Sequence, residues 1–217
     1  PEYKNALLVV GTRESDLVDY NNPRARFMFN FGDGAAACLL TRGYEKNRIL
    51  ETEMITDGSF AADVAVYGVG NSNFHRFNSV EKDFEKAEAA KEDGIGYIGL
   101  DVADPEAMKE RLDPISHSNF CRVIEGAAQK SGYTSTDINF LASIFMKNSI
   151  LNCILNNFNM TEEQSFILKS FGHVQSADAY IAVYEALKLK RIKDGDLVVM
   201  LGAGTGYSWA ATAVRWG

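Results

Sequence analysis

The chain has few residues of the kinds that build metal sites and disulfide frameworks. Its 217 residues include only three cysteines, and Cys38, Cys121 and Cys153 stand far apart among apolar neighbours. There is no CxxC pair and no cysteine–histidine cluster, so neither a zinc site nor a disulfide framework is expected. This cysteine usage favours a reduced, cytoplasmic setting in which each thiol is an inert, packed side chain.

The chain also lacks an excess of positive charge and any long apolar run. Its formal net charge is −7, and 46% of its residues are hydrophobic, as in ordinary globular proteins. Nucleic-acid binding favours a basic surface, and a membrane span needs about 20 consecutive apolar residues. Neither nucleic-acid binding nor a membrane-spanning segment is therefore expected. The chain begins at Pro1 without a methionine and enters an apolar run almost at once. We interpret this as the start of a cut or processed chain.

Glycines are concentrated near the C-terminus, where residues 197–206 read LVVMLGAGTG. A strand followed by glycines is typical of nucleotide-binding loops, but those loops continue into a helix and a further strand. Only eleven residues follow Gly206, and they alternate as a single strand does, so the sequence opposes a nucleotide site. Two interpretations stay open: a plain tight hairpin, or a glycine turn whose N–H groups hold an oxyanion.

The rest of the chain alternates apolar strands with amphipathic helices, which favours a layered α/β fold. Ala6–Gly11 is a continuous apolar run, and this predicts a strand buried on both faces. Asp104 followed by Pro105 predicts the start of a helix, which Pro114 is expected to interrupt. Ser176 is expected to cap a later helix. The other predicted strands are residues 35–40, 49–55, 138–143, 197–201 and 208–216, and the other predicted helices are residues 120–128, 150–158 and 176–189. The charged run 81–93 is expected to be a solvated helix or a mobile excursion.

Three segments occur here in the order and spacing of one known family. Residues 31–35 read FGDGA, residues 191–197 read RIKDGDL, and the chain closes with GAGTGYSWAATAVRW. Together they resemble 3-oxoacyl-acyl-carrier-protein synthase III, the initiating ketoacyl synthase of the thiolase superfamily. The resemblance covers the chain from Tyr3 to Gly217.

The resemblance implies a thiolase-like layered α/β fold built from two similar halves. Residues 1–58 would be the remainder of a truncated N-terminal half, and residues 59–217 a nearly complete C-terminal half. Family members are considerably longer, and their nucleophilic cysteine lies in the part that would precede Pro1. None of the three cysteines stands at that position, so this chain alone is expected to be inactive.

The resemblance also points to site residues in the second half. In the family, a His and an Asn donate hydrogen bonds to the enolate that forms when malonyl-carrier protein loses CO₂. At the His position this chain has Phe145, with Ile144 one step away, and neither side chain can donate. At the Asn position it has His173, which can donate a hydrogen bond or move protons near neutral pH. The family's oxyanion glycine corresponds to Thr205, in the loop Gly204–Gly206. His75 and His117 are expected to be solvated loop residues.

The implied activity is acyl transfer from acyl-CoA or from an acyl-carrier-protein thioester. The reaction would be a decarboxylative Claisen condensation with a malonyl thioester, as in fatty acid or polyketide synthesis. The resemblance implies a homodimer and no cofactor or metal. The helix after Phe145 carries a single lysine, Lys147, so carrier protein and coenzyme A stay alternatives. A function of another class also stays open: a non-catalytic or degenerate thiolase-fold partner subunit.

Overall fold

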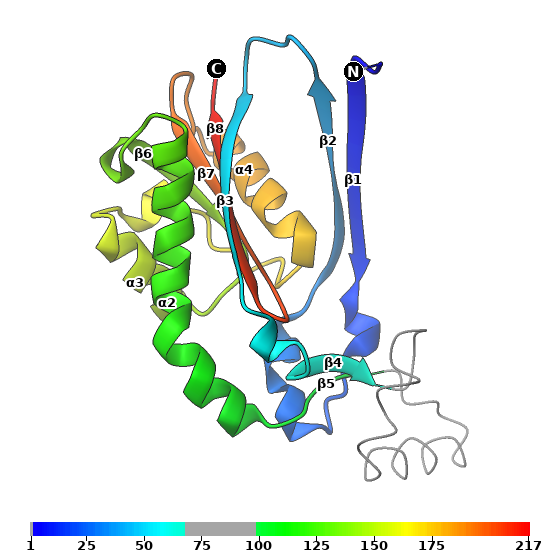
Figure 1. Cartoon of the computed structure of the whole chain (residues 1–217). Helices are drawn as coiled ribbons and strands as arrows, with labels where there is room; N and C mark the ends of the chain where they lie inside the picture. The colour runs from blue at the N-terminus through cyan, green and yellow to red at the C-terminus, as the bar shows by residue number, and fades with distance from the viewer. Residues whose placement is uncertain (1, 68–98) are drawn as a thin grey trace.

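The computed structural model of the chain describes residues 2–67 and 99–217, and it confirms the predicted layered α/β fold (Figure 1). The charged run 81–93 and His75 lie outside the described residues. The strands are β1 (Asn5–Arg13), β2 (Asp33–Thr41), β3 (Arg48–Thr56), β4 (Val64–Tyr67), β5 (Gly99–Val102), β6 (Ile138–Ser143), β7 (Leu197–Gly204) and β8 (Ser208–Arg215), and the helices are α2 (Pro105–Lys130), α3 (Asn148–Asn157) and α4 (Asp178–Lys188).

A four-stranded sheet in the order β3-β8-β7-β6 forms the centre of the molecule. Strands β6 and β7 run parallel, whereas β8 runs antiparallel to both of its neighbours. Helices α2 and α3 pack on one face of this sheet and α4 packs on the other (Figure 1). Both faces are therefore apolar, as a sheet covered by helices on both sides requires. Fully buried side chains on the α2 side include Trp209, Val199 and Leu201, and those on the α4 side include Phe140 and Val198.

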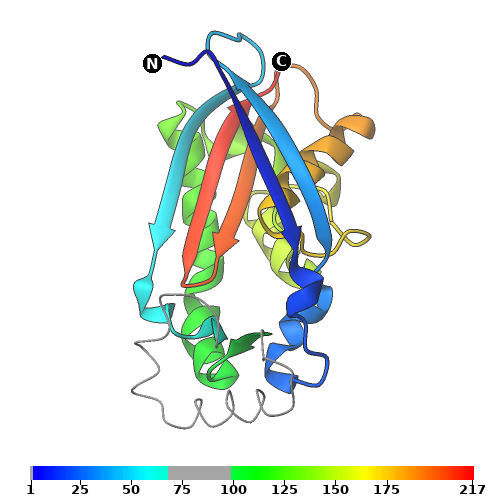
Figure 2. The same cartoon turned by 90° about the vertical axis from the view of Figure 1, so that its right-hand side faces the viewer.

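Strands β1 and β2 form a separate antiparallel ribbon beyond α4, and the ribbon crosses in front of the central sheet (Figure 2). The predicted strands are present, but the expectation that the first is buried on both faces is wrong. Leu7, Val9 and Leu39 lie on one face of the ribbon and are 66%, 63% and 65% exposed. Among the described residues no layer packs on that face, so the apolar pattern of β1 has nothing to bury it. Two 3₁₀ turns, Glu14–Leu17 and Pro23–Asn30, lie between β1 and β2.

Helix α2 begins where the sequence predicts, because Asp104 Oδ1 accepts hydrogen bonds from the backbone N–H groups of Glu106 and Ala107. The predicted interruption at Pro114 is wrong, since α2 continues to Lys130. A proline removes the bond to the carbonyl four residues earlier, which here belongs to Glu110. Glu110 and Pro114 are both exposed, so water can satisfy that carbonyl, and the helix curves instead of breaking (Figure 1).

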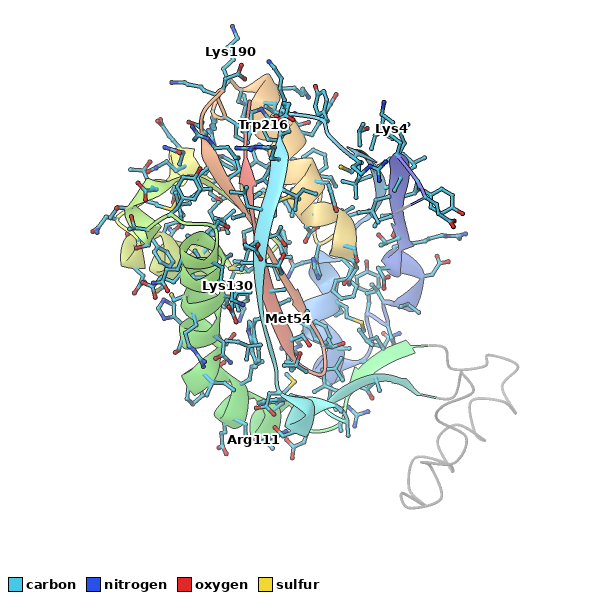
Figure 3. The ribbon with its side chains drawn as sticks, turned by 45° about the horizontal axis from the view of Figure 1, so that its top comes forward. Lys4, Met54, Arg111, Lys130, Lys190 and Trp216 are labelled. Atoms are coloured by element: carbon cyan, nitrogen blue, oxygen red, sulfur yellow. The ribbon has the colours of Figure 1, made fainter. Side chains whose placement is uncertain are left out.

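Both ends of α2 are held by ion pairs to other elements. Near its start, Arg111 Nη2 lies 2.5 Å from Asp63 Oδ2, and its guanidinium sits 4.7 Å from the centre of the Phe60 ring. At its end, Lys130 Nζ lies 2.7 Å from Glu53 Oε2 on β3. Figure 3 labels Arg111 and Lys130 at the two ends of this helix. The curved helix thus spans the length of the sheet.

Three side chains differ from their expected environments. Cys153 is exposed rather than packed, because it falls on the face of α3 opposite to the buried Leu151. His117 lies on α2 instead of in a loop. Ser176 lies inside a 3₁₀ turn and does not cap α4. Across residues 2–67 and 99–217, no helix has the length and apolar character that crossing a membrane requires.

Candidate functional site

A cavity of about 2130 Å³ lies between the β1–β2 ribbon, helix α4 and the strands β7 and β8. Residues of both the ribbon and the sheet line it. Most of its lining side chains are apolar, including Leu8, Leu40 and Val183. His173, Phe145, Gly204 and Thr205 also line it, so the structure brings four of the five predicted site residues to one cavity. Gly206, the fifth, is not among the residues that line it.

Phe145 owes its place to the parallel pairing of β6 and β7. The carboxyl ends of these strands meet at one edge of the sheet, where Ser143 is the register partner of Leu201 and Ile144 N–H donates to the Leu201 carbonyl at 3.1 Å. Phe145 follows directly, and β7 runs on beyond it into the glycine loop. Ligands of α/β proteins bind at such carboxyl edges.

The backbone of His173 is fixed by the FGDG segment. His173 N–H donates to the Asn30 carbonyl at 2.7 Å, and Gly32 N–H donates to the His173 carbonyl at 3.0 Å. These two hydrogen bonds require glycine at positions 32 and 172, where the backbones come close together. A Cβ on Gly32 would lie 2.1 Å from the Phe171 carbonyl oxygen, and Gly172 has a φ of +73°. The FGDGA motif therefore positions His173.

The side chain of His173 is paired with Asp178, the first residue of α4. His173 Nδ1 lies 2.5 Å from Asp178 Oδ2, and Asp178 is fully buried. The same carboxylate accepts the backbone N–H of Val174 at 2.6 Å and that of Phe145 at 2.7 Å. Asp178 thus holds His173 and the end of β6 together. The sequence analysis missed Asp178, although a carboxylate at a helix start, five residues after a histidine, was a visible signal.

Aromatic rings enclose the imidazole. The Phe31 ring lies edge-on to it at 5.4 Å between centroids, and the Phe145 ring stacks on it at 6.4 Å. The side chain of His173 retains 19% of its exposure, toward the cavity that it lines. The arrangement can therefore move a proton at one imidazole nitrogen in an apolar surrounding.

The glycine loop is a hairpin between β7 and β8, in which Gly204 and Ser208 are register partners. Both interpretations of the glycine loop predict a turn between two strands, so an oxyanion role for Thr205 stays a prediction. The backbones of Tyr207 and Asp57 exchange two hydrogen bonds of 2.8 Å, which fix the loop to the end of β3. Burial raises the pKa of the Tyr207 phenol, so that side chain stays protonated at neutral pH.

None of the three cysteines has the environment of an activated nucleophile. Cys38 lies on β2 and lines the cavity, and Cys153 faces solvent. Cys121 Sγ lies 3.7 Å from His117 Nε2 on α2, where burial, aided by the charge of Glu125, raises the pKa of the thiol. A raised pKa disfavours the reactive thiolate. In the described part of the chain, no group of three or more His, Cys, Asp or Glu side chains is placed to hold a metal ion.

Two family profiles match the chain. Residues 1–58 match the one described as 3-oxoacyl-[acyl-carrier-protein] synthase III. Residues 128–216 match the one described as the C-terminal part of the same synthase. Together these segments cover more than half of the chain.

Similar curated proteins and solved structures carry the same description. Beta-ketoacyl-[acyl-carrier-protein] synthase III 1 of Bacillus cereus is 27% identical over 99% of this chain, and the synthase III of Aquifex aeolicus is 27% identical over 98%. The chain spans 58% of the length of each. The crystal structure of the Aquifex aeolicus protein matches 98% of this chain and 58% of its own with a TM-score of 0.74 at 22% identity. The Pseudomonas aeruginosa synthase III structure matches 98% of this chain and 59% of its own with a TM-score of 0.77 at 19% identity. The fold is therefore the thiolase-like fold that was expected.

Proposed function

Because the chain belongs to the 3-oxoacyl-[acyl-carrier-protein] synthase III family, we propose that it is part of an acyltransferase that takes its acyl group from a thioester. In the reaction implied for the family, that group is condensed with a malonyl thioester as CO₂ is lost, in fatty acid or polyketide synthesis. The donor is acyl-CoA or an acyl-carrier-protein thioester.

The observation that carries this proposal is the shared cavity of His173 and the glycine loop. His173 stands at the family's Asn position and is held there by Asp178, with Phe145 in the place of the family's His. Gly204 and Thr205 line the same cavity. The apolar lining suits an acyl chain, and the backbone N–H of Thr205 is our candidate donor to a thioester oxyanion.

We place the nucleophile of the proposed enzyme on a cysteine outside this chain, in the N-terminal portion that the family resemblance implies. The exposed apolar face of the β1–β2 ribbon supports a further layer that packs there in the longer protein. We retain the division into residues 1–58, the remainder of an N-terminal half, and residues 59–217, a C-terminal half. β3, within the first segment, pairs with β8 of the second, so the two halves share a sheet.

A homodimer in the cytoplasm is the proposed form of the whole protein, and the widely separated free cysteines agree with a reducing compartment. The alternative of a non-catalytic partner subunit has no support from the relatives, which are named as synthases.

The test compares the isolated chain with the product of the longest open reading frame that contains it. Each is incubated with radiolabelled octanoyl-CoA and then analysed by mass spectrometry for a stable acyl group. The isolated chain should stay unlabelled at Cys38, Cys121 and Cys153, whereas the longer protein should be acylated on a cysteine that precedes Pro1. Stable acylation of the isolated chain, or none of the longer protein, would contradict the proposal.

A further inference from the structure

We propose that His173 and Asp178 form a general-base pair, and that the acyl acceptor preferred by this site is an alcohol or an amine on an apolar group. The inference rests on the proposed function, in that the site must receive an acyl thioester. It differs from the implied condensation in the acceptor, because a malonyl thioester needs donors to its enolate rather than a base.

The first step is the protonation pattern of the imidazole. Asp178 is buried and accepts the backbone N–H groups of Val174 and Phe145, so we assign it as a carboxylate that also accepts the N–H of His173 Nδ1, which lies 2.5 Å from Oδ2. In the neutral ring, the second nitrogen, Nε2, then carries the lone pair. Within residues 2–67 and 99–217, Nε2 has no hydrogen-bond partner, and the side chain lines the cavity. A lone pair at that position accepts a proton and cannot donate one to an enolate.

The second step concerns the donors that an enolate would need. The site has lost the family's histidine donor to Phe145, whose ring stacks on His173 and fills that side of the imidazole. What remains is a base whose orientation is set by a buried carboxylate, the arrangement that activates hydroxyl groups in acyl-transfer enzymes. The aromatic rings of Phe31 and Phe145 beside it favour an acceptor with an apolar or aromatic body.

The proposed transfer balances without any further reactant. His173 Nε2 takes the proton of the acceptor's O–H or N–H as that oxygen or nitrogen bonds to the thioester carbonyl carbon. The tetrahedral intermediate collapses, the C–S bond breaks, and the imidazolium returns the proton to the departing thiolate. The products are an ester or amide and a free thiol. Asp178 acts as a positioning residue, since it touches His173 and not the reacting atoms.

The test uses the product of the longest open reading frame that contains the chain, with octanoyl-CoA as donor. The acceptors 2-phenylethanol and phenethylamine are compared with malonyl-CoA, and ester, amide and β-ketoacyl products are measured by mass spectrometry together with released CO₂. We expect ester or amide to form faster than the condensation product. His173→Asn should lower the kcat/KM of that transfer by about 10²–10⁴-fold, and imidazole added to His173→Ala should restore part of it. His117→Asn, the same substitution on α2, should change it less than about twofold because a surface site away from the cavity is altered.

Asp178→Asn separates positioning from folding. We expect its kcat to fall by about 10²–10⁴-fold with an unchanged KM for octanoyl-CoA, as for an orienting carboxylate. If this variant does not fold, the His173 variants decide. Faster condensation than ester or amide formation, with both reactions unchanged in His173→Asn, would overturn the inference and leave the proposed function standing. Absence of octanoyl transfer to the enzyme and to every acceptor would instead remove the proposed function and the inference with it.

Discussion

At the scale of single residues, Phe145 lines the cavity with a side chain that cannot donate a hydrogen bond. Its ring stacks on His173 at 6.4 Å, and its backbone N–H is already bound by Asp178. Phe145→His would keep the backbone bond and add a ring N–H at the position where the resemblance implies the family's histidine. One such donor to a developing oxyanion contributes about 10²–10³-fold in rate. We therefore expect the variant, in the full-length protein, to release CO₂ from malonyl-CoA at least about tenfold faster than the unmodified protein.

A labelled malonyl-CoA assay with octanoyl-CoA as donor measures that gain. Phe29→His is the control, because Phe29 is exposed and its ring contacts Tyr20, away from His173. An equal gain in the control, or no gain in Phe145→His while the enzyme is still acylated, would show that the His position is not what limits condensation.

The family resemblance pointed to His173 and not to the carboxylate that binds its side chain. The Gly-His pair before a helix was visible in the sequence, and so was Phe145 at the end of a strand. Asp178 joins them only after a 3₁₀ turn, Gln175–Ala177, brings the start of α4 back to the histidine. Propensities do not give the geometry of such a turn, so the five-residue spacing could suggest the pairing but could not establish it.

At the scale of elements, Pro114 controls the course of α2. The helix continues through it and is tied at Asp63 by Arg111. Pro114→Ala would restore the bond to the Glu110 carbonyl, and a proline in a helix interior costs up to about 3 kcal/mol relative to alanine. The larger entropy of the unfolded chain offsets about 0.4–1 kcal/mol of that gain. We expect a net rise of about 1 kcal/mol in the free energy of unfolding, measured by urea denaturation.

Pro105→Ala is the matched control, because Pro105 occupies the first turn of the same helix, where proline is favoured. It should leave the free energy of unfolding unchanged or slightly lower. If Pro114→Ala destabilises the protein instead, the curvature of α2 is needed for Arg111 to reach Asp63.

The Glu53–Lys130 pair joins the end of α2 to β3, and it should make this contact sensitive to acid. The hydrogen bond from Lys130 lowers the pKa of Glu53 below its ordinary 4.5, although desolvation opposes the shift. A lowered pKa in the folded state contributes stability above the ordinary value, and that contribution disappears as the pH falls through the lowered pKa. Glu53→Gln should therefore lower the thermal midpoint at neutral pH, and the difference from the unmodified chain should shrink in acid.

Differential scanning calorimetry along a pH series measures this difference. Glu51→Gln, on the same strand, is the control and should give a smaller change at neutral pH. A difference between Glu53→Gln and the unmodified chain that grows in acid would contradict the assigned direction of the pKa shift.

Most elements of the fold could be predicted from local patterns, because apolar runs and helical spacing are local properties. The Asp104–Pro105 start of α2 is an example. The wrong expectations concerned features that depend on tertiary packing and not on the local sequence. A continuous apolar run indicates a strand, but whether β1 is buried depends on which layers are present. Pro114 disfavours a helix locally, yet the tertiary contacts at both ends of α2 outweigh it.

At the scale of the whole molecule, the β1–β2 ribbon is the feature that limits how the isolated chain behaves. β1 is an edge strand, and Leu7, Val9 and Leu39 expose one apolar face of the ribbon. Each side chain of this size gains about 1.5–3 kcal/mol when it is removed from water, and such edges pair readily with other chains. We expect the isolated chain to self-associate, as measured by size-exclusion chromatography with light scattering.

The double variant Leu7→Lys with Leu39→Lys should shift the isolated chain toward the monomer, because it places charges on that face. Leu189→Lys, just after α4, removes another exposed leucine and should not change the assembly. In the product of the longest open reading frame, where we propose that a further layer covers the ribbon, the same double variant should lower stability, since two charges would then be buried. A monomeric unmodified chain at every concentration would show that the ribbon does not drive association. Equal stability of the longer protein with and without the two lysines would show that no layer packs on this face.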